Sequence, residues 1–288
     1  MKKRVTDFSR MKKTGEKIAM VTAYDCTFAR IAEAAEVDLI LVGDSAGMVM
    51  LGYDNTLPVT IDDMITFGAA VRRGAPDTFI VMDMPFGSYQ AGEDEAVNNA
   101  VEIMKQTGAD ALKLEGGKEV TSLVERLVTA GIPVMGHVGM TPQKSLRFGG
   151  FIVQGRNEAT ADAVIADSIA LAQAGAFSIV VEAVPAPVAG IITSLLDAPT
   201  IGIGAGPQCS GQVLVMHDLL GLTPEGSVAR FVNRYASLGN TALEAFREYR
   251  QEVKQAVFPG TQHQYGMSEE ECTRLVAKYS PDRNVQEG

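Results

Sequence analysis

The sequence predicts an α/β protein built as a single (β/α)₈ barrel. Short apolar runs alternate along the chain with longer amphipathic segments, and this alternation indicates parallel strands joined by helices. Eight such runs occur, and nearly all of them are apolar on both faces, as strands covered by helices should be. Eight strand–helix units match a closed barrel more simply than they match an open doubly wound sheet.

The predicted strands and helices follow one another in regular order. The first strand is IAMVTAY at 18–24, and the amphipathic segment FARIAEAAE at 28–36 follows it. The other seven predicted strands are residues 38–44, 79–85, 111–115, 132–139, 177–184, 199–206 and 212–218. Helical segments at 93–108, 118–131 and 159–175 each end in glycine directly before a strand, which is typical of a helix C-cap and a short connection.

Two connections are longer than a helix requires, namely residues 45–60 and 139–156. Both follow the carboxyl end of a predicted strand. Long loops on that face of a barrel usually build or cover its active site, so we expect the site there.

The chain continues beyond the eighth strand with two predicted helices, at 225–238 and 241–258. A polar tail with little periodicity begins at about Thr261. We therefore predict one domain, residues 1–260, which holds the barrel with its N-terminal helix and the C-terminal helices. The tail, 261–288, is a candidate for disorder.

Composition narrows the class of protein. Of the 288 residues, 46% are hydrophobic and 21% are charged, which fits a folded globular protein. The net charge of −10 opposes attraction to nucleic acid or to anionic lipid, so we expect neither as a partner.

We expect a soluble cytoplasmic protein. The basic start of the chain lacks the apolar stretch of a secretory signal, and the most apolar long window, 177–196, is interrupted by Glu182 and two prolines. The three cysteines, Cys26, Cys209 and Cys272, are odd in number and far apart, which predicts neither a disulfide framework nor a zinc site.

Polar side chains at the ends of the predicted strands are the main functional signal. They are Asp25, Asp44, Asp83, Glu115, His137, Glu182 and the pair His217 and Asp218. Strand ends of a barrel converge on one mouth, where carboxylates repel one another unless a cation, a proton or a basic side chain lies among them.

Asp44, Asp83 and Glu115 together offer all-oxygen ligation, which suits Mg²⁺ or another hard divalent ion. Each has a structural alternative, because Asp44 could cap a helix, Asp83 could be a turn residue and Glu115 could be a loop charge. Three carboxylates at equivalent places on successive strands favour a site.

Lys113 lies two residues before Glu115, so both side chains point into the barrel, with the lysine one layer deeper. It could form a structural ion pair, act as a Schiff-base nucleophile, or hold an oxygen of an anionic substrate. The acidic neighbours favour the third role, because they keep the amine protonated.

Glu182 closes the sixth strand, across the barrel from the metal candidates. It could remove a proton from a carbon next to a polarised carbonyl, or else cap a helix or pair with Arg156.

His137 could bind substrate, ligate the metal or satisfy a loop carbonyl. His217 and Asp218 are predicted to be a packed polar pair, and Gly202 to Gly206 lack the spacing of a dinucleotide-binding loop.

The chain closely resembles the ketopantoate hydroxymethyltransferase family. The resemblance spans about residues 18 to 260. The segments that carry it are TAYD (22–25), LVGDSAGM (41–48), LPVT (57–60), VRRGAP (71–76), DMPFGSY (83–89), KLEGG (113–117), GHVGMTPQ (136–143), FGGFIVQGR (148–156), IGIGAG (201–206) and GQVLVMHD (211–218).

The resemblance implies a barrel of the phosphoenolpyruvate/pyruvate type and a transferase reaction. A hydroxymethyl group would pass from 5,10-methylenetetrahydrofolate to 3-methyl-2-oxobutanoate, giving 2-dehydropantoate (ketopantoate) and tetrahydrofolate in pantothenate biosynthesis. The reaction would proceed through a metal-stabilised enolate with Mg²⁺ or another divalent ion. The family is typically a homodecamer.

Site residues carry over by matching motif. Asp44, Asp83 and Glu115 would be the metal positions, directly or through water, and Glu182 would be the catalytic base. Ser45 beside Asp44, with Asp83 and Lys113, would hold the 2-oxo acid. His137 is a further candidate for substrate binding because of its place at the end of the fifth strand.

Two alternatives belong to other classes of protein. A carbon–carbon lyase like isocitrate lyase would share metal chelation of a 2-oxo acid, but it predicts a catalytic cysteine in a loop, and the chain has no Cys-Gly-His run. A non-catalytic barrel would bind ligand without turnover, and it gives no reason to collect carboxylates at the mouth.

Overall fold

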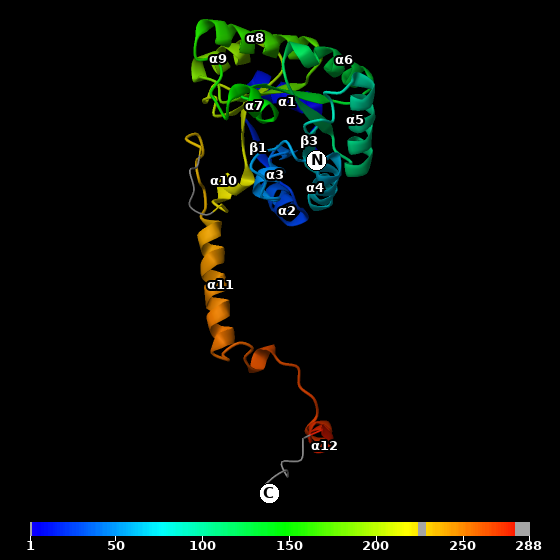
Figure 1. Cartoon of the computed structure of the whole chain (residues 1–288), viewed down its shortest axis with the longest axis vertical. Helices are drawn as coiled ribbons and strands as arrows, with labels where there is room; N and C mark the ends of the chain where they lie inside the picture. Colours follow the sequence, from blue (N-terminus) through cyan, green and yellow to red (C-terminus); the bar gives the residue numbers. More distant parts are fainter. Residues whose placement is uncertain (1, 224–228, 280–288) are drawn as a thin grey trace. The chain divides into compact units, whose positions relative to one another are not determined.

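The computed structural model describes residues 2–223 and 229–279 and confirms the predicted barrel (Figure 1). Eight parallel strands pair in sequence order, and the eighth pairs with the first to close the sheet. The strands are β1 (Ile18–Thr22), β2 (Leu39–Val42), β3 (Phe79–Asp83), β4 (Ala111–Glu115), β5 (Val134–Gly139), β6 (Ser178–Glu182), β7 (Thr200–Ile203) and β8 (Gly211–Leu214).

Helices surround the barrel and occupy its longer connections (Figure 1). The α-helices of this unit are α1 (Val5–Thr14), α2 (Cys26–Ala34), α3 (Ala46–Val49), α4 (Ile61–Gly74), α5 (Glu93–Thr107), α6 (Thr121–Thr129), α7 (Ser145–Phe148), α8 (Glu158–Gln173), α9 (Ala186–Leu195) and α10 (Met216–Leu220). Two 3₁₀ turns are η1 (Lys118–Val120) and η2 (Pro142–Lys144).

Local sequence explains where several helices begin. Asp25 accepts hydrogen bonds from the backbone of Thr27 and Phe28, so it is the N-cap of α2. Thr60 and Asn157 cap α4 and α8 in the same manner. Such caps satisfy backbone N–H groups that lack a partner within the first turn.

Strand alternation divides the core into two layers. In β2, Leu39 and Leu41 lie in the cluster inside the barrel, whereas Ile40 and Val42 lie between the sheet and its helices. Successive side chains of a strand point to opposite faces, which explains why runs apolar on both faces became barrel strands.

Helix α1 covers the end of the barrel at which the strands begin. Phe8 is fully buried, with ring centroids 5.1 Å from Phe79 and 6.2 Å from Phe177. The Lys12 ammonium donates hydrogen bonds to the backbone carbonyls of Thr193 and Ala198 at 2.8 and 3.0 Å. The other end of the barrel, at which the strands end, is therefore free to hold the predicted site.

A second unit comprises residues 238–288. Its described part contains α11 (Leu238–Lys254), a 3₁₀ turn η3 (Thr261–His263) and α12 (Glu269–Tyr279). Neither α11 nor α12 has a buried residue. The prediction of one domain over 1–260 stays a prediction.

The structure corrects two element boundaries. Of the helix predicted at 225–238, residues 225–228 lie outside the described residues, and 229–237 form a turn and irregular backbone instead. The strand predicted at 212–218 ends at Leu214, because the Met216 N–H donates to the Thr22 hydroxyl and α10 begins there.

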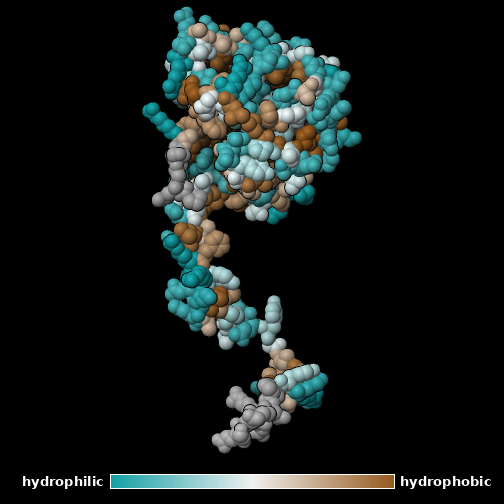
Figure 2. Space-filling view, in the orientation of Figure 1, coloured by the Kyte–Doolittle hydropathy of each residue, from teal (hydrophilic) through white to brown (hydrophobic). Residues whose placement is uncertain are grey.

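The surface agrees with the composition. Hydrophilic side chains cover much of the visible face of the barrel unit, with apolar ones in small groups between them (Figure 2). Among the described helices, none combines the length and the apolar character that crossing a bilayer requires.

Candidate active site

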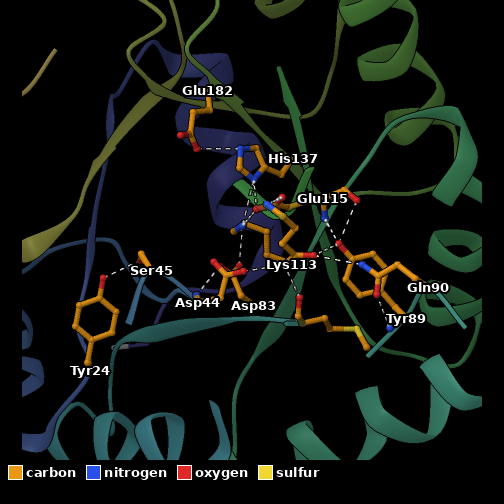
Figure 3. A network of polar contacts seen from close by, with 12 residues as sticks. Tyr24, Asp44, Ser45, Asp83, Tyr89, Gln90, Lys113, Glu115, His137 and Glu182 are labelled. Atoms are coloured by element: carbon orange, nitrogen blue, oxygen red, sulfur yellow. Dashed lines mark hydrogen bonds and ion pairs between the residues drawn. The ribbon is translucent and has the colours of Figure 1, made fainter. Parts of the chain in front are cut away.

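Strand register brings the predicted charged residues together inside the mouth of the barrel (Figure 3). Asp83 of β3 pairs with Lys113 of β4, and Glu115 of β4 pairs with His137 of β5. All four side chains are buried. The Lys113 Nζ atom lies 2.7 Å from Asp83 Oδ1 and 4.0 Å from Glu115 Oε1, so the lysine links two of the carboxylates.

Asp44 follows β2 and lies beside Asp83. Its backbone N–H donates to Asp83 Oδ2 at 3.0 Å. Burial raises the pKa of Asp44 well above its ordinary value, and the charges of Asp83 and Glu115 raise it further. Burial also raises the pKa of Asp83, although Lys113 opposes the shift. A cation between these two groups would relieve both shifts.

Glu115 is held in its ionised form. Burial alone would raise its pKa, but the hydrogen bond and charge of His137, together with Lys113, outweigh that effect and lower it. Lys113 shows the complementary result: burial would lower the pKa of its amine, but Asp83, Glu115 and Asp44 raise it. The site therefore holds a buried ammonium among carboxylates.

His137 lies between two acids on different sides of its ring. Its Nδ1 atom is 3.4 Å from Glu115 Oε1, and its Nε2 atom is 3.1 Å from Glu182 Oε2. Burial and the charge of Lys113 act to lower the pKa of His137, but the two carboxylates raise it to about 9. The two carboxylates thus favour the protonated imidazole, although the Lys113 ammonium lies 3.3 Å from Nδ1 and opposes it.

Ser45 and Glu182 mark the accessible side of the site. Both are partly exposed, whereas Asp44, Asp83 and Lys113 are buried. The Ser45 hydroxyl lies 2.9 Å from the Tyr24 hydroxyl, and burial raises the pKa of Tyr24, so the phenol stays protonated. A ligand would reach the charged cluster past these two residues.

The loop of residues 140–157, which we call the β5–α8 loop, is attached at both ends to the backbone around Glu182. The Met140 N–H donates to the Glu182 carbonyl at 2.9 Å, and the Gln154 N–H donates to the Ala183 carbonyl at 3.0 Å. Gly139 precedes the loop with φ 92°, and a Cβ atom there would lie 2.3 Å from the Glu182 carbonyl oxygen. Only glycine permits this close approach of the two backbones.

Comparison with known proteins identifies the family. A sequence model described as ketopantoate hydroxymethyltransferase matches residues 2–261. The chain belongs to the ketopantoate hydroxymethyltransferase family. The match confirms the resemblance proposed from the motifs, and it makes the chain a transferase instead of a lyase or a non-catalytic barrel.

Relatives support the family assignment over nearly the whole chain. A protein of Heliobacterium modesticaldum named 3-methyl-2-oxobutanoate hydroxymethyltransferase is 51% identical over 272 residues, which is 94% of this chain and 98% of the relative. A protein of the same name from Carboxydothermus hydrogenoformans is 51% identical over 271 residues, with 94% and 98% covered.

Among solved structures, 2,3-dimethylmalate lyase, a member of the PEP mutase/isocitrate lyase superfamily, is similar with a TM-score of 0.57. Its sequence is 16% identical, and the match covers 95% of this chain and 94% of that one. At this identity the similarity concerns the fold alone, and it agrees with the closed eight-stranded barrel of this chain.

Several polar residues predicted at strand ends lie elsewhere in this member of the ketopantoate hydroxymethyltransferase family. Asp25 is engaged as the N-cap of α2. His217 and Asp218 lie on α10 and not on a strand, with the His217 ring 5.7 Å from the Tyr24 ring. Burial lowers the pKa of His217 and raises that of Asp218.

Two residues of the site were not predicted from the sequence. Gln143 of η2 donates from its side chain to Asp44 Oδ2 at 2.8 Å and from its backbone to Glu115 Oε2 at 3.0 Å. Tyr89 donates its hydroxyl to Gln143 Oε1 at 2.6 Å. Both lie in the family motifs DMPFGSY and GHVGMTPQ, but neither carries charge, and strand position gave no signal for them.

The donor set suits a hard cation. Asp44 and Asp83 lie side by side with raised pKa values, which is the arrangement that Mg²⁺ uses when it takes one or two carboxylates and completes its shell with water or substrate oxygens. Within residues 2–223 and 229–279, no group of three or more His, Cys, Asp or Glu side chains is arranged so that it could hold a metal ion by itself. Glu115 is engaged by Lys113 and His137, so its role as a metal ligand stays a prediction.

A separate cavity of about 280 Å³ lies between the β5–α8 loop and α8. Lys144, Arg147 and Asp167 are among its lining residues, and the charged cluster of Asp44, Asp83 and Lys113 does not contribute to it.

Proposed function

We propose that the chain transfers a hydroxymethyl group from 5,10-methylenetetrahydrofolate to 3-methyl-2-oxobutanoate, giving 2-dehydropantoate and tetrahydrofolate in pantothenate biosynthesis. The names of relatives at 51% identity support this substrate. The observation that carries the proposal is the buried ammonium of Lys113 among Asp44, Asp83 and Glu115, with Glu182 at the accessible edge. This arrangement suits a small anionic substrate that must lose a proton.

Mg²⁺ or another divalent ion is the proposed cofactor, held by Asp44 and Asp83 directly and by Glu115 through water. Bound there, it would polarise the keto group of the substrate and lower the energy of the negative charge that develops when a proton leaves. The raised pKa values of the two aspartates support this placement, because a cation would offset their mutual repulsion.

The substrate's own charge is balanced by side chains of the chain. Lys113 and the charged His137 would bind oxygens of the 2-oxo acid, and the Ser45 hydroxyl, fixed by Tyr24, would donate a further hydrogen bond. The lysine acts as a cation here and not as a Schiff-base nucleophile, because its neighbours keep it protonated.

Glu182 is the proposed catalytic base. Its side chain is 14% exposed and lies on the accessible side, whereas the other acids of the site are almost fully buried. It would take the proton from C3 of the substrate, and that carbon would then bond to the one-carbon unit of the folate. Both bonds from this carbon unit to the folate nitrogens break, and one water molecule supplies the hydroxyl oxygen of the product. The β5–α8 loop would exclude bulk water from this step.

We propose further that the chain assembles into a homo-oligomer, a decamer as the family resemblance implies, in the cytoplasm. Leu243, Phe246, Tyr249 and Val253 of α11 are exposed, which supports burial against another subunit. All three cysteines are free thiols, which suits a reducing compartment. Light scattering of the full chain measures the number of subunits.

The test of the proposed function is turnover of the purified chain with both substrates, with Mg²⁺, after chelation, and in Glu182→Gln. We expect 2-dehydropantoate only with the cation, and a loss of about 10²- to 10⁴-fold in kcat in the variant. Glu158→Gln, at the exposed start of α8, is the matched control and should retain activity. Absence of product with every divalent ion would refute the proposal.

A further inference from the structure

Every polar group of the Gln143 side chain has a partner within the site. Its Nε2 atom donates to Asp44 Oδ2 at 2.8 Å and to the Met84 carbonyl at 2.9 Å. Its Oε1 atom accepts from the Tyr89 hydroxyl at 2.6 Å and from Gln90 Nε2 at 3.4 Å. The side chain is buried, so these bonds replace water completely.

The partners leave only one orientation for the amide. The Met84 carbonyl accepts hydrogen bonds but cannot donate one, so the NH₂ group must face it, and the Asp44 carboxylate lies on the same side. Burial raises the pKa of Tyr89, so its hydroxyl remains a donor toward Oε1. A flipped amide would leave two acceptors facing each other, which is costly in a buried network.

Gln143 also connects the site to the β5–α8 loop. It belongs to η2, within that loop, and its backbone N–H donates to Glu115 Oε2 at 3.0 Å. One residue of the loop thus contacts two carboxylates, one directly after β2 and one on β4.

We propose that Gln143 is a positioning residue that orients the Asp44 and Glu115 carboxylates for a divalent cation, and that it does so only while the β5–α8 loop is seated on the barrel. The inference rests on the proposed function, because it assumes that these carboxylates serve a cation. Cation affinity would then depend on the loop, since displacing η2 removes both hydrogen bonds at once. Tyr89 supports the arrangement by fixing the amide.

The test is binding of Mn²⁺ to the full chain without substrates, measured by electron paramagnetic resonance of the free ion. Gln143→Met keeps the length and burial of the side chain but removes its donors. We expect its dissociation constant to rise about 10- to 100-fold, as is typical when a group that orients a ligand is lost.

Gln154→Met is the matched control, because it is the same change in the same loop. The Gln154 side chain donates to the Ile152 carbonyl at 2.9 Å and leaves the carboxylates untouched. We expect its Mn²⁺ affinity to stay within about twofold of that of the unaltered chain.

A second variant, Tyr89→Phe, keeps the inference testable if Gln143→Met does not fold. It removes the hydroxyl that fixes Oε1, and we expect weaker Mn²⁺ binding by at least about twofold, in the same direction. In turnover, both variants should raise the Mg²⁺ concentration needed for half-maximal rate more than they lower kcat at saturating Mg²⁺.

The outcomes separate this inference from the proposed function. If the unaltered chain binds Mn²⁺ and forms product but a folded Gln143→Met binds the ion equally well, the inference is wrong and the proposed function stands. If the unaltered chain forms product but binds no Mn²⁺, the inference and the cation assignment both fail. If it binds Mn²⁺ without forming product, the proposed reaction fails, and the two variants still decide the role of Gln143.

Discussion

The Nε2 atom of His137 lies 3.1 Å from Oε2 of Glu182, while the other nitrogen of the same ring faces Glu115 at 3.4 Å. The two acids come from β6 and β4, on either side of β5, which carries the histidine. The ring is therefore held between two carboxylates, which accounts for a pKa of about 9.

This relationship predicts how stability depends on pH in the metal-free protein. The folded-state pKa of His137, about 9, lies above its ordinary value of 6.5. The stabilisation is therefore fully present below about pH 6.5 and is lost as the pH rises through about 9, and it amounts to at most about 3 kcal/mol. Unfolding of chelated protein by denaturant at a series of pH values measures it.

His137→Asn should lose this part of the pH dependence, whereas His263→Asn in the second unit should keep it. If the free energy of unfolding of the unaltered chain and of His137→Asn fell in parallel between pH 6.5 and 9, the imidazole would not carry the charge we assign to it.

Lys113 should not form a covalent adduct with the substrate. Its amine is buried beside Asp83 and its pKa is raised, so the neutral form that attacks a carbonyl is rare. Borohydride reduction of the enzyme in the presence of 3-methyl-2-oxobutanoate should leave the mass of the chain unchanged. An added mass equal to that of the substrate plus two hydrogens minus one water, mapped to the peptide of β4, would show that the lysine is a nucleophile.

Divalent cations should stabilise the chain in a pH-dependent way. Ionisation of Asp44 is unfavourable in the metal-free fold because burial and Asp83 raise its pKa, and a bound cation removes that cost. At a Mg²⁺ concentration of about 100 times the dissociation constant we expect about 2.7 kcal/mol of stabilisation, seen as a higher Tm. The gain should shrink as the pH falls through the raised pKa, because protons then compete with the cation.

Asp83→Asn should abolish the rise in Tm, and Asp162→Asn, an exposed aspartate of α8, should preserve it. Equal stabilisation in both variants would place the cation somewhere other than beside Asp44 and Asp83.

Phe8→Ala should destabilise the barrel without impairing chemistry. Phe8 is fully buried against Phe79 and Phe177 at the end of the barrel opposite the site, and its removal leaves a cavity. We expect a loss of about 3–5 kcal/mol in the free energy of unfolding and little change in kcat. Ile31→Ala, at a side chain that is 56% exposed, should cost less than about 1 kcal/mol. A similar loss in both variants would mean that α1 does not close the barrel.

The sequence predicted the barrel because its signal is local. Most of the apolar runs lie between helices that bury them, and all eight predicted runs became strands. Strand ends were harder to predict where an apolar run continues past the strand. QVLVMHD was predicted as one strand, but the Met216 N–H donates to the Thr22 hydroxyl of β1 and α10 begins at Met216. That hydrogen bond joins residues 194 positions apart in the sequence, so no local sequence pattern predicts it.

The same distinction applies to the site. Asp83, Lys113, Glu115 and Glu182 could be predicted because strand position alone places charged residues at the mouth. Gln143 could not, since an uncharged residue in a loop becomes functional only through its contact with Asp44, 99 residues away along the chain.

The attachment of the β5–α8 loop constrains how the enzyme could be re-engineered. Both ends of the loop are tied to the carbonyls of Glu182 and its neighbour Ala183, which itself adopts a left-handed φ of 47°. A graft that altered the spacing between those two anchors would displace the peptide units that position Glu182, the proposed base. Insertions or sequence libraries meant to change donor specificity should therefore be confined to residues 145–152, downstream of η2 and short of the second anchor, where the loop can vary without moving Glu182.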